Sequence, residues 1–152
     1  MQPVFRIRNL SVCIKGKTLL EIDALDIPAG STAVIGPNGA GKSTLLRALI
    51  GQAGQGEITL LGEAAAPQIR AGKAAWVGQH GRYNMPMTVR EYIALAAFVQ
   101  KGRLNHEWAD ELLNYFDLAA LAEKRIGRLS GGEQQRANII RALLQNAPVL
   151  LL

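Results

Sequence analysis

The stretch GPNGAGKST, from Gly36 to Thr44, has the residue types and spacing of a loop that binds nucleotide phosphates. Gly36, Gly41, Lys42 and Ser43 stand at the fixed positions of the pattern G-x-x-x-x-G-K-[ST]. Glycines let backbone N–H groups approach phosphate oxygens without a Cβ in the way, and a following helix adds its positive dipole end. Lys42 would supply a cation to the β- and γ-phosphates, and the Ser43 hydroxyl would ligate Mg²⁺. The stretch therefore predicts a nucleoside triphosphate site.

A second stretch, LSGGEQQR from Leu129 to Arg136, has the form of an open helix N-terminus. Ser130 and Glu133 have the S-x-x-E spacing of a capping box, in which the serine caps the helix and the glutamate reaches back. The two glycines between them leave backbone N–H groups accessible. The stretch therefore predicts a second anion site, although an ordinary capped helix has the same spacing.

Strand patterns lie before and after the first motif. The alternation in VFRIRNLSVCI and LLEIDALDI, broken at Lys15-Gly16-Lys17, predicts an antiparallel strand pair. STAVIG, at 31–36, has the β-branched character of a short strand buried in a parallel sheet. KSTLLRALIG then predicts a helix that stops at Gly51. GEITLLGE, at 56–63, and KAAWVGQ, at 73–79, predict two further strands.

The pattern then becomes helical. Thr88 and Glu91 predict a capping box, and Trp108, Leu112 and Phe116 mark one face of a later helix. The chain closes on VLLL, which predicts another strand. Alternating strands and helices indicate an α/β fold with a helical insertion.

The two motifs, together with Gln79 in WVGQ, resemble the Walker A, signature and Q-loop motifs of the ATP-binding-cassette (ABC) ATPases. The resemblance covers essentially the whole chain. It implies a P-loop NTPase core, with a mostly parallel sheet and N-terminal antiparallel strands, and an α-helical subdomain. It divides the chain into a nucleotide-binding core at 1–80, a helical subdomain ending in the signature at 81–135, and the signature helix with the start of the Walker B strand at 136–152.

The resemblance also implies how the site works. Two domains would bind ATP and Mg²⁺ head to tail, so that the signature of one contacts the γ-phosphate of ATP held by the other. Lys42 and Gln79 would be catalytic, and Ser43 and Gln79 would hold Mg²⁺. The nucleotide-binding residues would be Gly36, Pro37, Asn38, Gly39, Ala40, Gly41, Lys42, Ser43, Thr44, Ser130, Gly131, Gly132, Glu133 and Gln134.

Two features depart from the family pattern. Ile14 stands where many members have an aromatic residue that stacks on adenine, so weaker apolar contact would replace stacking. In the family, PVLLL is followed by the Asp and Glu of Walker B and by a switch histidine, whereas this sequence reaches Leu152 first. We expect a C-terminally incomplete domain that binds nucleotide weakly and hydrolyses little. His80 and His106 precede the signature, so neither is expected to replace the switch histidine.

The charge, cysteine content and hydrophobicity of the chain limit where the protein acts and what it binds. The net charge is +5 with a pI of about 9.7, but the basic residues are dispersed, which argues against nucleic-acid binding. The single cysteine, Cys13, excludes an internal disulfide and fits a reducing compartment. The sequence shows no apolar stretch long enough to span a bilayer. We expect a cytoplasmic protein, bound to the inner face of the membrane through permease subunits.

The expected function is ATP hydrolysis that powers solute transport by an ABC transporter, with a second copy of the domain, permease subunits and a solute-binding protein as partners. NMPMTVREYIALAAF, at 84–98, resembles importers of metal ions and metal chelates, although Ala96 falls where many of them have glycine. One alternative is a remnant that binds nucleotide without hydrolysis. Another is a non-transport ABC ATPase that acts in DNA maintenance or at the ribosome. The DNA-maintenance type would have coiled-coil heptads between the Q-loop and the signature, and the sequence between Gln79 and Ser130 contains none.

Overall fold

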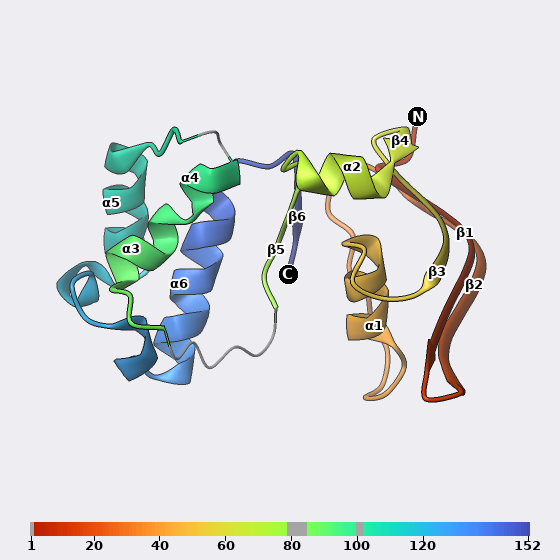
Figure 1. Ribbon diagram of the computed structural model, residues 1–152. Helices are drawn as coiled ribbons and strands as arrows, with labels where there is room; N and C mark the ends of the chain where they lie inside the picture. The colour runs from red at the N-terminus through yellow and green to blue at the C-terminus, as the bar shows by residue number, and fades with distance from the viewer. Residues whose placement is uncertain (1, 79–84, 100–101) are drawn as a thin grey trace. The chain divides into compact units, whose positions relative to one another are not determined.

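The computed structural model describes residues 2–78, 85–99 and 102–152. The chain forms two compact units, Met1–Ala71 and Gly72–Leu152. The first combines an antiparallel sheet with helices, and the second combines a helical cluster with a pair of parallel strands (Figure 1). The predicted α/β class is therefore confirmed. The division at residues 80 and 135 that the resemblance implies stays a prediction.

The first unit is built on a four-stranded antiparallel sheet with the strand order β2-β1-β3-β4. The predicted strand pair is confirmed, and it is joined by a two-residue turn in which Lys15 and Gly16 have φ values of 52° and 77°. Two residues with positive φ fit the right-handed twist of the flanking strands. The elements of this unit are β1 (Phe5–Ile14), β2 (Lys17–Ile27), α1 (Lys42–Leu49), β3 (Gln55–Leu60), β4 (Glu63–Ala64) and α2 (Ala65–Arg70).

An irregularity in β1 changes which residues face the core. Phe5 and Ile7 are buried, and the alternation then resumes at Leu10 rather than at residue 9. Asn9 lies between them with a φ of 50°, and the β1–β3 register shifts between Arg8 and Ser11. Such a bulge inserts one residue and returns the apolar side chains to the same face.

Helix α1 ends where the sequence predicts. Gly51 has a φ of 73°, and its N–H donates to the carbonyl of Ala48 at 2.9 Å. The N–H of Gln52 donates to the carbonyl of Arg47 at 2.8 Å. These two bonds form a Schellman motif, in which a left-handed residue after the helix satisfies its last carbonyl groups. α1 packs against β1 and β2 of the sheet.

The prediction of a buried strand over STAVIG, 31–36, is wrong. Residues 31–37 have no regular secondary structure, and the Ile35 side chain is 91% exposed. A β-branched run becomes a buried strand only when neighbouring strands satisfy its backbone groups. None of the described strands pairs with this segment.

The second unit contains the two parallel strands predicted around 73–79 and at the end of the chain. Ala74 pairs with Val149 and Trp76 with Leu151, and α6 packs against β5. The elements of this unit are β5 (Ala74–Trp76), α3 (Val89–Ala94), α4 (Ala96–Val99), α5 (His106–Tyr115), the 3₁₀ turns η1 (Ala119–Leu121) and η2 (Ile126–Arg128), α6 (Gly131–Leu144) and β6 (Val149–Leu151).

Helices α3, α4 and α5 pack around α6 (Figure 1). Their shared apolar core includes the fully buried Ile93, Leu113 and Ile140. Trp108, Leu112 and Phe116 pack against that core while staying partly exposed, so the predicted face of α5 is confirmed. The core of the second unit therefore fixes the helix that begins with the signature.

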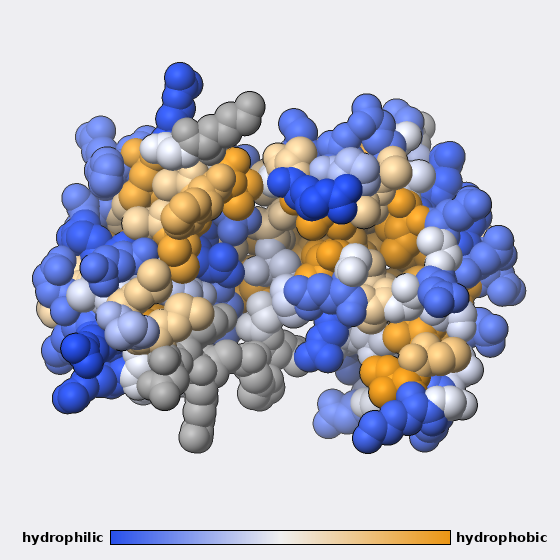
Figure 2. Space-filling view, viewed as in Figure 1, coloured by the Kyte–Doolittle hydropathy of each residue, from blue (hydrophilic) through white to orange (hydrophobic). Residues whose placement is uncertain are grey.

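The surface mixes hydrophilic and hydrophobic residues. Figure 2 shows hydrophilic residues spread over the visible face of each unit, with hydrophobic residues between them. Within the residues described, no helix has both the length and the apolar character needed to cross a bilayer.

Candidate functional site

The loop from Gly36 to Gly41 folds back on itself. The N–H of Ala40 donates to the carbonyl of Pro37 at 3.2 Å, closing a turn in which Gly39 has a φ of 84°. A Cβ at Gly36 would lie 3.3 Å from the Cβ of Ala40, so this approach is tight. Gly41 has a φ of 87°, and a Cβ there would lie 3.3 Å from Leu20 of β2. Glycine thus meets a conformational need at 39 and 41.

Lys42 lies across this loop. Its ammonium Nζ donates to the carbonyl oxygens of Gly36 and Pro37, each at 2.8 Å. Because both acceptors belong to the loop, the cation is held against the loop backbone. The geometry therefore presents a positive charge to a ligand in the loop.

Helix α1 begins directly after the loop. Its N-cap residue, Gly41, has no side chain to cap the helix, and the first turn contains no acidic residue. The positive dipole end of α1 therefore lies next to the loop. Ser43 and Thr44 lie in this first turn.

The predicted capping box at Ser130 and Glu133 is confirmed. The Glu133 carboxylate accepts from the backbone N–H and from the hydroxyl of Ser130, both at 2.7 Å, and the Glu133 N–H donates to the Ser130 Oγ at 3.3 Å. The hydroxyl bond, ahead of the backbone bond, lowers the pKa of the Glu133 carboxyl below its ordinary value. The N-terminus of α6 therefore already holds an anionic group.

Gly131 and Gly132 form the first turn of α6, and both are exposed. A Cβ at either position would meet nothing within 4 Å. The helix opening is thus accessible beside the capping box. Its backbone N–H groups provide donors of the kind that bind an anion.

The site residue Gln134 is buried, unlike its neighbours in the motif. It is 7% exposed, and its Nε2 donates to the carbonyl oxygens of Ile126 and Leu129, each at 3.1 Å. Both acceptors lie in the loop that leads into Ser130. The amide therefore bonds the protein's own backbone.

The sequence profile of the ABC transporter family matches residues 20–152. The chain belongs to the ABC transporter family. A "Hemin import ATP-binding protein HmuV" from Bradyrhizobium diazoefficiens is 39% identical to it over 97% of this chain and 57% of that protein. A "Probable metal transport system ATP-binding protein" from Chlamydia muridarum is 36% identical over 85% of this chain and 53% of that protein.

A solved structure agrees with this assignment. The structure of the ATP-binding subunit of an ABC transporter superposes with a TM-score of 0.80 and 25% identity, over 97% of this chain and 65% of that one. The chain spans a little over half the length of the curated relatives it matches. Membership in this family explains why one sequence contains both the phosphate-binding loop at 36–44, here called the P-loop, and the signature at 129–136.

One group of buried or partly buried side chains holds the signature helix of this ABC chain. The Tyr92 hydroxyl of α3 donates to the Asn138 Oδ1 of α6 at 3.1 Å, and the same oxygen accepts from Arg141 at 3.1 Å. The Arg141 guanidinium also lies 5.4 Å from the centre of the Tyr92 ring. These contacts fix α6 against α3.

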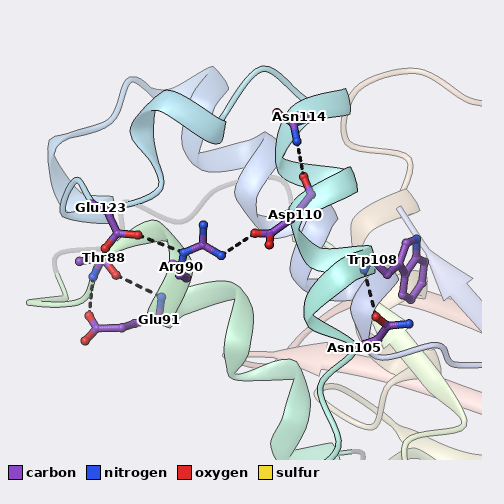
Figure 3. A network of polar contacts seen from close by, with 8 residues as sticks. All are labelled: Thr88, Arg90, Glu91, Asn105, Trp108, Asp110, Asn114 and Glu123. Carbon is purple, nitrogen blue, oxygen red and sulfur yellow. Dashed lines mark hydrogen bonds and ion pairs between the residues drawn. The ribbon is translucent and has the colours of Figure 1, made fainter.

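A second network, on the surface, joins the other parts of the helical unit (Figure 3). Arg90 donates to Asp110 of α5 at 2.6 Å and to Glu123 at 3.0 Å, and the Asp110 bond, ahead of the Glu123 bond, raises the pKa of Arg90. Thr88 and Glu91 form the predicted capping box of α3. The segment around 88–91 is therefore tied to α5.

Other predicted residues are placed as follows. Gln79 and His80 lie outside the described residues, so the Mg²⁺ and catalytic roles of Gln79 stay predictions. Ile14, at the predicted adenine position, is 53% exposed at the end of β1. His106 is exposed at the start of α5. Across the ranges 2–78, 85–99 and 102–152, no three His, Cys, Asp or Glu side chains gather as a metal site.

Sequence reasoning missed the supporting polar residues of α6. Gln134, Asn138 and Arg141 recur at i, i+4 and i+7, on the face that also buries Ala137 and Ile140. Polar residues within a core-facing stripe need internal partners. That periodicity in the sequence could have predicted that Asn138 and Gln134 are buried and bonded within the protein.

Proposed function

We propose that this chain is the ATP-binding part of an ATPase subunit that powers an ABC transporter. The observation that carries the proposal is the P-loop geometry, in which the Lys42 ammonium lies on the carbonyl oxygens of Gly36 and Pro37 in front of an uncapped helix. A triphosphate fits this arrangement because its negative charge complements the ammonium group and the positive dipole end of the helix. Family membership supports the same ligand.

The proposed function gives each motif a role in binding or hydrolysing ATP. Gly36 to Thr44 would bind the phosphates of ATP, with Ser43 and Gln79 on Mg²⁺, which would neutralise charge on the transferring phosphoryl group. Ser130, Gly131 and Gly132 would donate hydrogen bonds to the γ-phosphate of ATP bound by a second copy. Lys42 and Gln79 would act in hydrolysis by the whole protein.

The transported solute would be a metal ion or a metal chelate. Two relatives, 39% and 36% identical to this chain over 57% and 53% of their own length, carry the names hemin import and metal transport ATP-binding protein. The stretch at 84–98, which resembles importers of that type, supports this choice. Permease subunits, a second copy of the chain and a solute-binding protein would be the partners, and the chain would act at the cytoplasmic face of the membrane.

A charge-removal experiment at Lys42 tests the proposal. Lys42→Ala should weaken binding of a fluorescent ATP analogue by at least about tenfold, because charge-assisted hydrogen bonds are among the strongest polar contacts. Binding is measured by fluorescence titration with Mg²⁺ present. Lys124→Ala is the matched control, since Lys124 is an exposed lysine in the second unit.

Two results would contradict the proposal. One is wild-type protein that fails to bind the analogue at all. The other is Lys42→Ala protein that binds it as tightly as Lys124→Ala protein, because Lys42 would then have no contact with the phosphates. The expected result is loss of affinity in Lys42→Ala alone.

A further inference from the structure

Gln134 is an unusual residue of the signature helix because its polar side chain is buried. Among the residues that the structure describes, only Gln134 and Asn138 are both polar and buried. An amide NH₂ group has two N–H donors. With bonds to the carbonyls of Ile126 and Leu129, each at 3.1 Å, both donors are used.

The two acceptors belong to the short segment that leads into the signature. Ile126 and Leu129 are the start and the C-cap of η2, and Ser130 follows Leu129 directly. The capping box orders Ser130 and Glu133 only within the helix start itself. The two hydrogen bonds of the Gln134 side chain therefore join the first turn of α6 to the segment before it.

The same segment is bonded on another side to the start of α3. The N–H of Ile126 donates to the carbonyl of Met87 at 2.9 Å, and the N–H of Val89 donates to the carbonyl of Lys124 at 3.0 Å. Thr88 and Arg125 form an antiparallel bridge between these two pairs. The segment thus lies between the residues before α3 and the first turn of α6.

The chemistry of Gln134 argues against direct contact with a nucleotide. Its N–H groups are committed to backbone oxygens, and the group that remains, Oε1, is an acceptor. Phosphate oxygens are acceptors too, so they would gain no hydrogen bond from it. Any influence of Gln134 on a phosphate must pass through the backbone that it holds.

We propose that Gln134 is a positioning residue that locks the segment 126–129 onto the first turn of α6 and so sets Ser130, Gly131 and Gly132 for the phosphate of a nucleotide bound by a second copy. The proposal rests on the function proposed above. It assigns Gln134 a role through Ser130 in place of the nucleotide contact that the family resemblance implies.

The test replaces the amide by a side chain of equal length without donors. Gln134→Met is compared with Gln135→Met, which makes the same chemical change at the next position of the same helix. Three quantities are measured in each protein: affinity for a fluorescent ATP analogue, hydrogen exchange of the peptide 126–133, and ATP-dependent pairing by light scattering after size exclusion.

We expect Gln134→Met to leave affinity for the analogue within about twofold, since the P-loop is untouched. Exchange across 126–133 should rise, and pairing should require on the order of tenfold more protein, because two hydrogen bonds are lost. Gln135→Met should match wild type in all three. Exchange in 31–44 should stay constant in both variants, which separates this effect from general destabilisation.

Unchanged exchange across 126–133 in Gln134→Met, or an equal change in Gln135→Met, would overturn the proposal. If Gln134→Met fails to fold, Gln134→Asn replaces it, because the shorter side chain withdraws the amide from both carbonyls; the same exchange result decides. Wild-type protein that neither binds ATP nor pairs would contradict the proposed function instead, and the exchange measurement would still test the Gln134 bonds.

Discussion

Two polar side chains in the candidate site are satisfied by the protein itself. The Lys42 ammonium bonds carbonyl oxygens of its own loop, and the Ser130 hydroxyl bonds the Glu133 carboxylate. An ammonium has three N–H donors, of which two bond these neutral carbonyl groups, and a phosphate would bond the third. The Ser130 hydroxyl has one donor, which the Glu133 carboxylate accepts, so a phosphate would have to compete with that anion.

The Glu133 carboxylate provides a test at the scale of one residue. Its hydrogen bond from the Ser130 hydroxyl lowers its pKa, so Ser130→Ala should raise the pKa of Glu133 toward the ordinary value of about 4.3. Carbon-detected NMR titration of the Glu133 carboxyl measures it. Thr88→Ala, which alters the other capping box, is the control and should leave the Glu133 pKa unchanged.

The sign of the pH effect follows from that shift. Because the folded-state pKa is lowered, the capping box stabilises α6 above the ordinary carboxyl pKa and loses that contribution as the pH falls through the lowered value. A wild-type pKa at or above the ordinary value, or one that Ser130→Ala does not move, would contradict this account.

At the scale of elements, the structure confirms the predictions that depend on local signals. The boxes at Thr88 and Ser130 and the stop at Gly51 depend on residues within one turn, and each is confirmed. The strand expected over 31–36 depends on neighbouring strands, and it is absent from the described segment. The bonds of Gln134 reach residues five and eight positions back, which no capping pattern includes. Local sequence signals therefore predict where a helix begins or ends better than they predict which segments it pairs or bonds with.

The end of α1 gives a test at this scale. Gly51→Ala should lower the free energy of unfolding by about 1 kcal/mol, because a Cβ disfavours the left-handed conformation that Gly51 adopts at a φ of 73°. Gly51→Asn should cost less, since asparagine tolerates that conformation. Asn146 already does so after α6, with a φ of 46°. Urea unfolding measures both.

If the two substitutions at Gly51 destabilise the protein equally, conformation is not the cause. A loss confined to Gly51→Ala fits the Schellman motif. Neither substitution changes a group of the P-loop.

At the scale of the whole molecule, the P-loop and the signature motif are carried by different units. The P-loop belongs to Met1–Ala71 and the signature to Gly72–Leu152. The family and the two motifs could be predicted from the sequence because each motif is a contiguous run of glycines, a serine and charged residues. The internal partners of Lys42 and Gln134 could not, because they are backbone oxygens, which the residue types do not reveal.

In the proposed function, the P-loop of one copy and the signature of another close over a single ATP. The most direct measurement is thiol cross-linking of a protein with Asn38→Cys and Gly131→Cys, after the exposed Cys13 has been replaced by serine. Gly131 has room for a side chain, since a Cβ there meets nothing within 4 Å. We predict covalent dimers that form with ATP and are lost in Lys42→Ala. Cross-linking that is independent of ATP, or that occurs equally in each single-cysteine protein, would contradict the head-to-tail arrangement.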